Sequence, residues 1–240
     1  MNKYEIDAIN EINLFKKKMT KRDSLVYKIS KKVQNKTNSL IPGKVQKVIT
    51  EGVKSMIKVV LFTSKYITVK SPKLANLEER ENLAKEKLNL YRKTATISGA
   101  GTGLGGLILG LADFPILLAI KINFLFNLAN IYDIDARDYK ERLYILYVFQ
   151  LAFSEGNERR KTYDKIINWS SYIKELPEDM NDFDWKNFQQ EYRDYIDFSK
   201  MLQIIPGIGA PVGAYVNYKL MSKLAYVSTN CFRMRYFSLN

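Results

Sequence analysis

The chain has 240 residues, of which 46% are hydrophobic, so it is long enough for a substantial core and too apolar to be disordered. Its formal net charge of +13 lies entirely in residues 1–96, which hold 22 Lys+Arg against 9 Asp+Glu, whereas residues 97–240 hold 16 of each. The absence of histidine excludes Ser-His-Asp and Cys-His catalysis, and the single cysteine, Cys231, excludes a disulfide framework and a thiolate metal site. We therefore expect no cofactor, no metal and no catalytic residue, with Cys231 as an apolar packing residue.

The basic block suits two kinds of polyanion, a nucleic acid and an anionic membrane. Its lysines alternate with aliphatic residues instead of stacking aromatics, arginine is scarce among them, and no nucleic-acid motif is present. These features disfavour a nucleic acid and favour anionic membrane lipids as the partner. A coding bias toward lysine is the alternative without functional meaning, although it would not confine the imbalance to one region.

Helical spacing of apolar residues runs from residue 3 to about residue 35, and Pro42 can begin a second helix over about 42–66. Five lysines of the second helix fall within an arc of about 80°, opposite its valines and isoleucines. They are Lys44, Lys47, Lys54, Lys58 and Lys65. The pattern predicts a basic amphipathic helix whose lysines contact anionic headgroups. The alternative is a core-packing helix with a solvated lysine face.

A third helix is predicted from Pro72, with Ser71 as its N-cap, to about residue 93. It leads directly into a glycine-rich apolar stretch. Arg92 and Lys93 stand immediately before that stretch, where cations anchor a membrane-entering segment on the cytoplasmic side.

The glycine-rich stretch, residues 94–112, has nineteen residues without a charge, and six of them are glycine. Nineteen residues are about enough to span a bilayer as a helix, but each glycine costs a water-exposed helix roughly 0.8–1 kcal/mol relative to alanine. We therefore expect a second helix to pack closely on this backbone, forming a glycine-rich apolar helical hairpin that extends to about residue 132. The glycines of that contact are Gly101, Gly103, Gly105, Gly106 and Gly110. The stretch can span, enter or rest on a membrane.

Part of the same stretch, Gly101-x-Gly103-x-x-Gly106, matches the dinucleotide-binding fingerprint as a string of letters. That fingerprint works between a strand and a helix, with an acidic residue about twenty positions later. Here a polar helix precedes the glycines and residues 124–132 supply no acid, so we expect no nucleotide there.

Asp113 is the one charge in the apolar centre, directly before Phe114-Pro115. Its carboxylate can cap a helix that starts at Pro115, or it can serve as a proton carrier or ion-pair partner in a closed core. The cap is the favoured interpretation. Lys121, two turns later, is expected to extend its ammonium to the surface or to pair with a carboxylate.

The second half of the chain continues with helical periodicity. A helix over about 136–153 is capped by Asp133 or Asp135, Gly156-Asn157 breaks it, a polar helix runs to about Leu176, and Asp184 caps the next one. No strand alternation persists. A second apolar patch free of charge covers residues 201–218, and we expect a loop to Ala210 and then a helix from Pro211 to Phe237 that ends near two arginines.

These patterns predict an all-α fold, a compact multi-helix domain over residues 1–240 with a basic helical part (1–96) and an apolar, aromatic part (97–240). The order of its motifs resembles the EcsC family of bacterial proteins. The motifs are Gly103-Leu-Gly-Gly, Ala112-Asp-Phe-Pro, Pro206-x-x-Gly209-Ala-Pro-Val-Gly213-Ala, Asn217-Tyr and Phe232-Arg-Met-Arg. The resemblance implies a bacterial cytoplasmic protein linked to the membrane, and the operon that names the family also encodes an ABC transporter.

The sequence therefore favours a non-enzymatic accessory protein at the inner face of the cell membrane, with anionic lipids as partner and ABC transporter subunits as a further partner that the resemblance implies. The residues chosen for its functional centre are Gly101, Gly103, Gly105, Gly106, Gly110, Asp113, Pro115, Gly209, Gly213 and Asn217. Two alternatives remain, a soluble helical hydrolase that uses aspartates and a membrane-inserting hairpin that perturbs lipid.

Overall fold

A computed structural model describes residues 1–21, 43–62, 73–103, 114–196 and 210–239 of the protein. These residues form helices and no strand, so the all-α prediction is confirmed over the described part of the chain. The helices are α1 (Lys3–Thr20), α3 (Gly43–Phe62), α4 (Leu77–Gly103), α6 (Phe114–Ile131), α7 (Tyr139–Phe153), α8 (Gly156–Ile167), α9 (Trp169–Glu175), the short 3-10 helix η2 (Met180–Asp182), α10 (Trp185–Tyr195) and α12 (Ala210–Tyr236).

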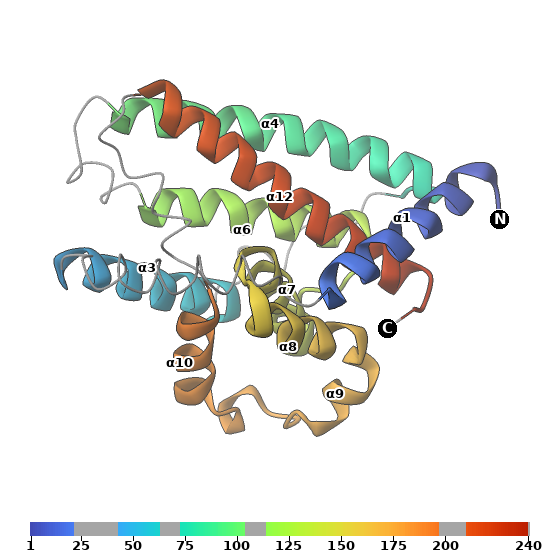
Figure 1. Ribbon diagram of the computed structural model, residues 1–240. Coiled ribbons are helices and arrows are strands. Elements are labelled where there is room, and N and C mark those ends of the chain that lie inside the picture. The colour runs from blue at the N-terminus through green and yellow to red at the C-terminus, as the bar shows by residue number, and fades with distance from the viewer. Residues whose placement is uncertain (22–42, 63–72, 104–113, 197–209, 240) are drawn as a thin grey trace.

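The longest elements are α4 and α12, which have 27 residues each and lie side by side (Figure 1). They run antiparallel, because Glu81 near the start of α4 contacts Arg233 near the end of α12, whereas Arg92 lies over Tyr218 of the first half of α12. Helix α6 packs against both of them, and α3 packs on the other side of α6.

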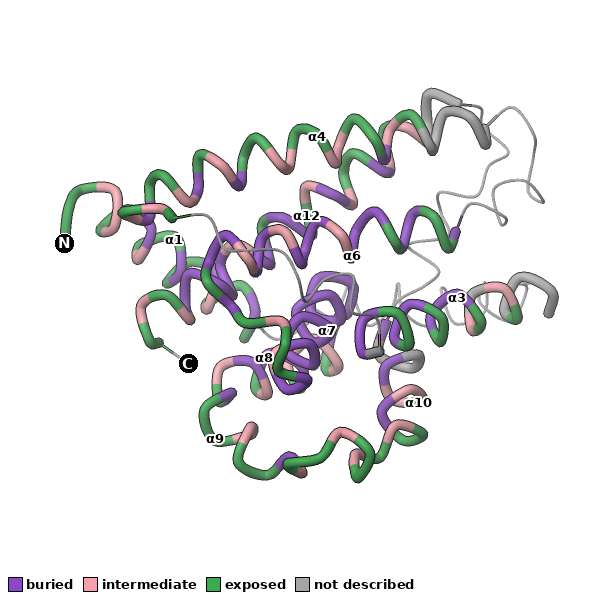
Figure 2. Tube along the Cα trace, turned by 180° about the vertical axis from the view of Figure 1, so that it is seen from behind, coloured by how far each residue is buried: buried purple, intermediate pink, exposed green. Residues whose placement is uncertain are grey.

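Helix α7 forms the centre of the molecule, as the burial colours of Figure 2 show. Its sequence is apolar around the whole circumference, and a helix of that kind must be enclosed by others. Every residue from Leu143 to Phe153 is buried. The hydroxyl of Tyr144 donates to the carbonyl of Cys231 on α12 at 3.0 Å, and the hydroxyl of Tyr192 on α10 donates to the carbonyl of Leu146 at 3.1 Å.

Helices α3 and α6 approach each other closely at a glycine that sequence reasoning did not single out. A Cβ on Gly52 of α3 would lie 3.1 Å from Cδ1 of Phe114, the first residue of α6. Real Cβ contacts are seldom this short, so the absence of a side chain at Gly52 permits the contact.

Two helix starts differ from their predicted positions. Helix α4 begins at Leu77 instead of Pro72, because Asn76 caps it by accepting the amide of Glu79 at 3.0 Å. Helix α7 is capped by Asp138, which accepts the amide of Lys140 at 2.8 Å, and not by Asp133 or Asp135.

The aspartates predicted to cap α7 are used elsewhere. Asp133 has a positive φ of 58° in the turn after α6 and pairs with Arg80, and Asp135 pairs with Arg137. The break predicted at Gly156 is confirmed, because α7 ends at Phe153 and Gly156 begins α8 with a φ of 61°. The predicted cap at Asp184 is confirmed by its acceptance of the amide of Asn187 at 3.0 Å.

The predicted glycine-rich hairpin falls only partly within the described residues. Gly101 and Gly103 lie in the last turn of α4, which packs along α12. Gly105, Gly106, Gly110 and Asp113 lie outside the described residues, as does the part of the first predicted helix beyond residue 21. The closure of the hairpin through its glycines therefore stays a prediction.

Candidate functional site

The lysine face predicted over residues 42–66 is found on α3. Lys47, Lys54 and Lys58 are exposed, while the apolar side of the helix is buried against α6 and α7. The buried residues are Val53, Met56, Ile57, Val60 and Leu61. Lys44 belongs to α3, but its side chain is not among those that the structure describes. Lys65 lies outside the described residues. Because α6 and α7 cover most of the apolar side, the exposed face of α3 consists mainly of lysines, with Val59 as an exposed apolar residue beside them.

The adjacent cations Arg92 and Lys93 differ in their surroundings. Lys93 is exposed to solvent. Arg92 is half-buried, and its guanidinium lies 4.8 Å from the centre of the Tyr218 ring on α12, a cation–π contact between the two long helices.

The predicted functional centre includes residues at the starts of α6 and α12. Pro115 is exposed in the first turn of α6, and Gly213 lies in the first turn of α12. Gly209 lies outside the described residues. Asn217 is fully buried on α12, and within the described residues neither its amide nitrogen nor its amide oxygen has a hydrogen-bond partner.

Lys121 is buried inside the helical bundle, where sequence reasoning expected a surface lysine or an ion pair. Only 1% of the residue is exposed, and its ammonium donates to the carbonyl of Leu117 at 3.3 Å. The described residues supply no carboxylate to it. Burial disfavours the charged ammonium and lowers the pKa of Lys121 to about 8.

The most extensive polar cluster of the described chain is centred on Arg233 of α12. Its guanidinium donates to both carboxylate oxygens of Glu81 on α4 at 2.6 Å and also binds Glu11 of α1. The hydroxyls of Tyr4 and Tyr132 donate to the same Glu81 at 2.7 Å and 3.2 Å. This cluster ties α1, α4, α12 and the turn after α6 together.

The central pair of the cluster is nearly closed to solvent, since Glu81 is 3% exposed and Arg233 is 7% exposed, whereas the side chain of Glu11 is largely exposed. Burial by itself would raise the pKa of Glu81, but the hydrogen bonds and positive charge of Arg233 outweigh it and hold that pKa below its ordinary value. Glu81 is therefore a fixed carboxylate and not a proton donor near neutral pH.

Two further arginine pairs lie around this cluster. Arg80 of α4 binds Asp133 at 2.5 Å, and Arg235 of α12 binds Glu141 of α7 with both terminal nitrogens, at 2.8 Å and 3.0 Å. We call the region of these pairs the paired end of the molecule. It is made of Arg80, Glu81, Asp133, Glu141, Arg233 and Arg235.

The two arginines of Phe232-Arg-Met-Arg were predicted only to stand near the end of α12. In the structure they bind other helices, Arg233 to α4 and α1 and Arg235 to α7. The available signal was Glu81. It interrupts an apolar stripe of α4 made of Leu77, Ala84 and Leu88, and a charge in such a stripe needs a buried partner.

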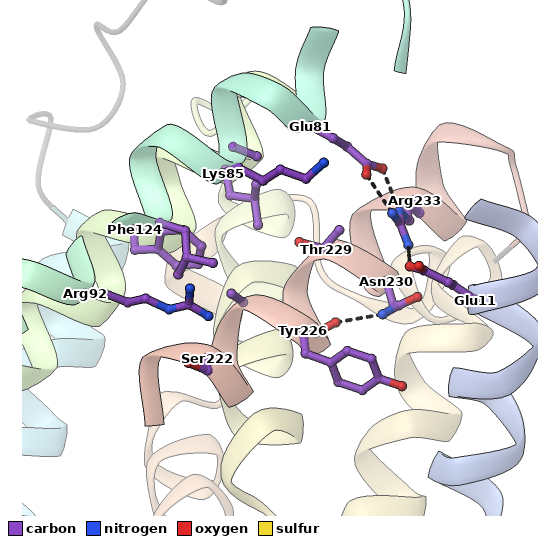
Figure 3. A pocket seen from close by; sticks show the side chains of 14 residues that line it. Glu11, Glu81, Lys85, Arg92, Phe124, Ser222, Tyr226, Thr229, Asn230 and Arg233 are labelled. Carbon is purple, nitrogen blue, oxygen red and sulfur yellow. Dashed lines mark hydrogen bonds and ion pairs between the residues drawn. The ribbon is translucent and has the colours of Figure 1, made fainter. Parts of the chain in front are cut away.

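A cavity of about 260 Å³ separates Arg233 from Arg92 along the α4–α12 pair. Figure 3 shows Arg92 at one side of this space and the Arg233–Glu81–Glu11 cluster at the other. Its walls come from α1, α4, α6 and α12. Apolar wall residues are Ala84, Leu88, Phe124, Leu128 and Ala225, and polar ones include Lys85, Ser222, Thr229 and Asn230.

Five aspartates of the described chain have structural roles. Asp133 and Asp135 are ion-paired, and Asp138, Asp179 and Asp184 cap helices. Over the described ranges, no group of three or more acidic or cysteine side chains is arranged to hold a metal ion. Cys231 is fully buried, and burial raises the pKa of its thiol, as expected of a packing residue.

The cavity between Arg92 and Arg233 has charged residues at both ends and apolar residues along its walls. It is therefore suited to binding a molecule with both charged and apolar parts.

Comparison with known proteins agrees with the resemblance seen in the sequence motifs. The chain is 44% identical to Protein EcsC of Bacillus subtilis (strain 168) over 216 residues, which cover 90% of this chain and 89% of that protein. It is 26% identical to the uncharacterized protein YdbA of the same organism over 164 residues, 66% of this chain and 57% of that protein. No solved structure matches it. The model of the EcsC protein family matches residues 7–237, and the chain belongs to that family.

Proposed function

We propose that this protein is a non-enzymatic accessory factor that binds the inner face of the cell membrane. The observation that carries the proposal is a set of exposed apolar side chains on three helices, toward the end of the molecule where α4 ends and where α6 and α12 begin (Figure 1). Ile97 is 72% exposed, Ile116 51% and Tyr215 60%. We call this region, defined by these three residues, the apolar end.

Cations lie about one helical turn behind the apolar end. Lys93 precedes Ile97 by four residues and Lys219 follows Tyr215 by four, a distance of about 6 Å along a helix. Interfacial helices bury their apolar residues roughly 5–10 Å below the headgroups, while lysines and tyrosines stay at headgroup level. With a membrane held against the apolar end, Ile97 and Ile116 would enter the acyl boundary, and Tyr215, Lys93 and Lys219 would lie at headgroup level.

The start of α3 lies at the same end of the molecule (Figure 1), so its lysines add long-range attraction to anionic lipid. Each lysine near an anionic surface contributes on the order of 1 kcal/mol at low salt. Within the described chain, α6 alone is long and apolar enough to cross a bilayer, and two thirds of it is buried inside the protein. A peripheral attachment is therefore the form of binding that we propose.

Vesicle flotation of a double variant, Ile97→Glu with Tyr215→Glu, tests the apolar end. We expect at least a tenfold loss of binding to vesicles with anionic lipid and little change in melting, because both side chains are exposed. The matched control is Ile6→Glu with Leu14→Glu, which changes two exposed apolar residues of α1 at the opposite end and should leave binding intact. Equal losses in both double variants would refute the assignment.

Fractionation of cells tests the location itself. Release of the protein from membranes by high salt or carbonate is expected for peripheral attachment. Resistance to carbonate would instead support the inserted, lipid-perturbing hairpin, and a wholly soluble protein would refute the proposal. Co-purification with ABC transporter subunits from gently solubilised membranes tests the partner that the family resemblance implies.

A further inference from the structure

The cavity between Arg92 and Arg233 has two chemically different ends (Figure 3). At the Arg233 end, three nitrogens of the guanidinium already bind Glu81 and Glu11. A ligand that enters the cavity therefore meets one arginine that is already paired with two carboxylates, a cluster whose net charge is negative. An anionic group is not attracted to that end.

The Arg92 end offers a cation without an acidic partner. No carboxylate among the described residues pairs with Arg92, and its guanidinium lies over the Tyr218 ring. Figure 3 shows its side chain pointing into the cavity. A guanidinium that stacks on an aromatic ring is held in a fixed plane and still presents its outer N–H groups, a geometry that fits a carboxylate or phosphate with two hydrogen bonds.

Lys85 adds a second positive charge on the same face of α4, two turns before Arg92 and about 10 Å from it along the helix axis. Its ammonium lies 5.8 Å from the centre of the Tyr4 ring. The wall that Phe124, Leu128 and Ala225 contribute is apolar. An occupant would thus have one anionic group and an apolar body.

The volume of about 260 Å³ limits how much of the occupant the cavity itself can hold. An anionic head group with a short alkyl chain is of suitable size, and a longer chain would extend out of the open cavity. We propose that the cavity binds one small anionic amphiphile, with a carboxylate or phosphate monoester on Arg92 and a short alkyl chain along Phe124 and Leu128. This inference does not depend on the proposed membrane contact.

Titration calorimetry with octanoate and octyl phosphate tests the site. Arg92→Gln should raise the dissociation constant of both probes at least tenfold. The control is Lys93→Gln, which removes the same charge from the adjacent, exposed position and should change the constant less than twofold. Equal weakening by both variants, or no binding of either probe by the folded wild-type protein, would overturn the proposal.

Two further measurements separate the head group from the chain and identify the source. Ser222→Leu should also weaken the binding of octyl phosphate at least tenfold, because the serine lines the cavity and its hydroxyl donates to the carbonyl of Tyr218 within its own helix. Inorganic phosphate and octanol should each bind at least tenfold more weakly than octyl phosphate. If either binds as tightly, the occupant is not an amphiphile.

Lysophosphatidic acid in neutral vesicles distinguishes a membrane source from a free metabolite. Arg92-dependent binding of the free probes assigns the occupant to solution, and tighter Arg92-dependent binding to these vesicles assigns it to the membrane. The Ile97→Glu, Tyr215→Glu variant should bind free octyl phosphate like the wild type, so failure of the membrane proposal and failure of this one give different results.

Discussion

The two ends of the α4–α12 helix pair differ in how their charges are paired. At the paired end, Glu81 and Arg233 are buried and bound to each other. Toward the apolar end, Arg92 and Lys93 lack carboxylate partners within the described residues. The same two helices build both regions, so the difference lies in their side chains. The carboxylates are concentrated where the helices are held together, and the unpaired cations lie beside exposed isoleucine and tyrosine. This contrast teaches that one end of the molecule stabilises the fold and that the other is available for a partner.

The largest expected effect tests the paired end. Glu81→Ala leaves Arg233 buried without its bidentate partner, and loss of one member of a buried pair costs about 3–5 kcal/mol. Urea unfolding should show this loss, while Glu86→Ala, on an exposed position of the same helix, should change stability by less than about 0.5 kcal/mol. A similar small effect for both variants would remove the distinction between the two ends.

The same pair predicts a pH dependence. The pKa of Glu81 is lower in the folded protein than in the unfolded chain, so its contribution is complete above the unfolded pKa and is lost as the pH falls through the folded one. We expect acid to destabilise the wild type more than a Glu81→Gln, Arg233→Met variant below about pH 4.5. Parallel stability curves for the two proteins in that range would contradict this assignment.

Lys121, between the two ends, should show the next largest effect and the opposite sign. Its pKa falls from 10.5 to about 8 on folding, so below pH 8 the buried lysine destabilises the protein by about 3 kcal/mol. Lys121→Met should therefore stabilise the protein at pH 7. Because the unfolded chain binds the extra proton between pH 8 and 10.5, the advantage of the methionine variant should shrink across that window. A pH-independent difference would show that the lysine is not desolvated.

A smaller effect is expected from Gly52, which tests whether the molecule is also tightly packed near the apolar end. Gly52→Leu would place a side chain where a Cβ is already 3.1 Å from Phe114, and overpacking of this kind costs typically about 1–3 kcal/mol. Ser55→Leu, at an exposed position of α3, should leave the melting temperature nearly unchanged. If both variants melt alike, α3 and α6 adjust to each other freely.

The smallest effect on stability is expected from the lysine face of α3. Replacement of Lys44, Lys47, Lys54 and Lys58 with glutamine should leave melting near the wild type but weaken binding to anionic vesicles at least tenfold. Neutral vesicles should bind almost as before. Unaltered vesicle affinity would reduce the stripe to a solvated face, and tighter binding of the wild type to duplex DNA or RNA at equal salt would identify a different polyanion.

Sequence periodicity predicted the helices well because each apolar stripe is a local property. The start of α12 near Pro211 and the cap at Asp184 follow from proline and aspartate chemistry within one turn. The residue that caps α7 was harder to predict, because several aspartates stand close together in the sequence. Asp138 caps the helix, whereas Asp133 forms an ion pair with Arg80, which is distant in the sequence.

The candidate site was mostly beyond sequence reasoning for the same reason. Glu81 and Arg233 are 152 residues apart, and Glu11 and Arg233 are 222 apart. Nothing local to either residue specifies its partner, although a charge on an apolar stripe indicates that a partner exists. Arg92 was selected for its place before the glycines, but its contact with Tyr218 and its position in a cavity depend on how α4 and α12 are aligned.

The long separation of α4 and α12 in the sequence also determines when they can pack together during biosynthesis. At roughly 5–20 residues per second, the ribosome needs about 7–27 s to proceed from the end of α4 to the end of α12. Through that interval the face of α4 that carries Leu77, Glu81 and Ala84 has no α12 to cover it. The apolar residues of this face are thus accessible to chaperones on the nascent chain. The ion pair between Arg233 and Glu81 forms only after nearly all of the described chain has been made.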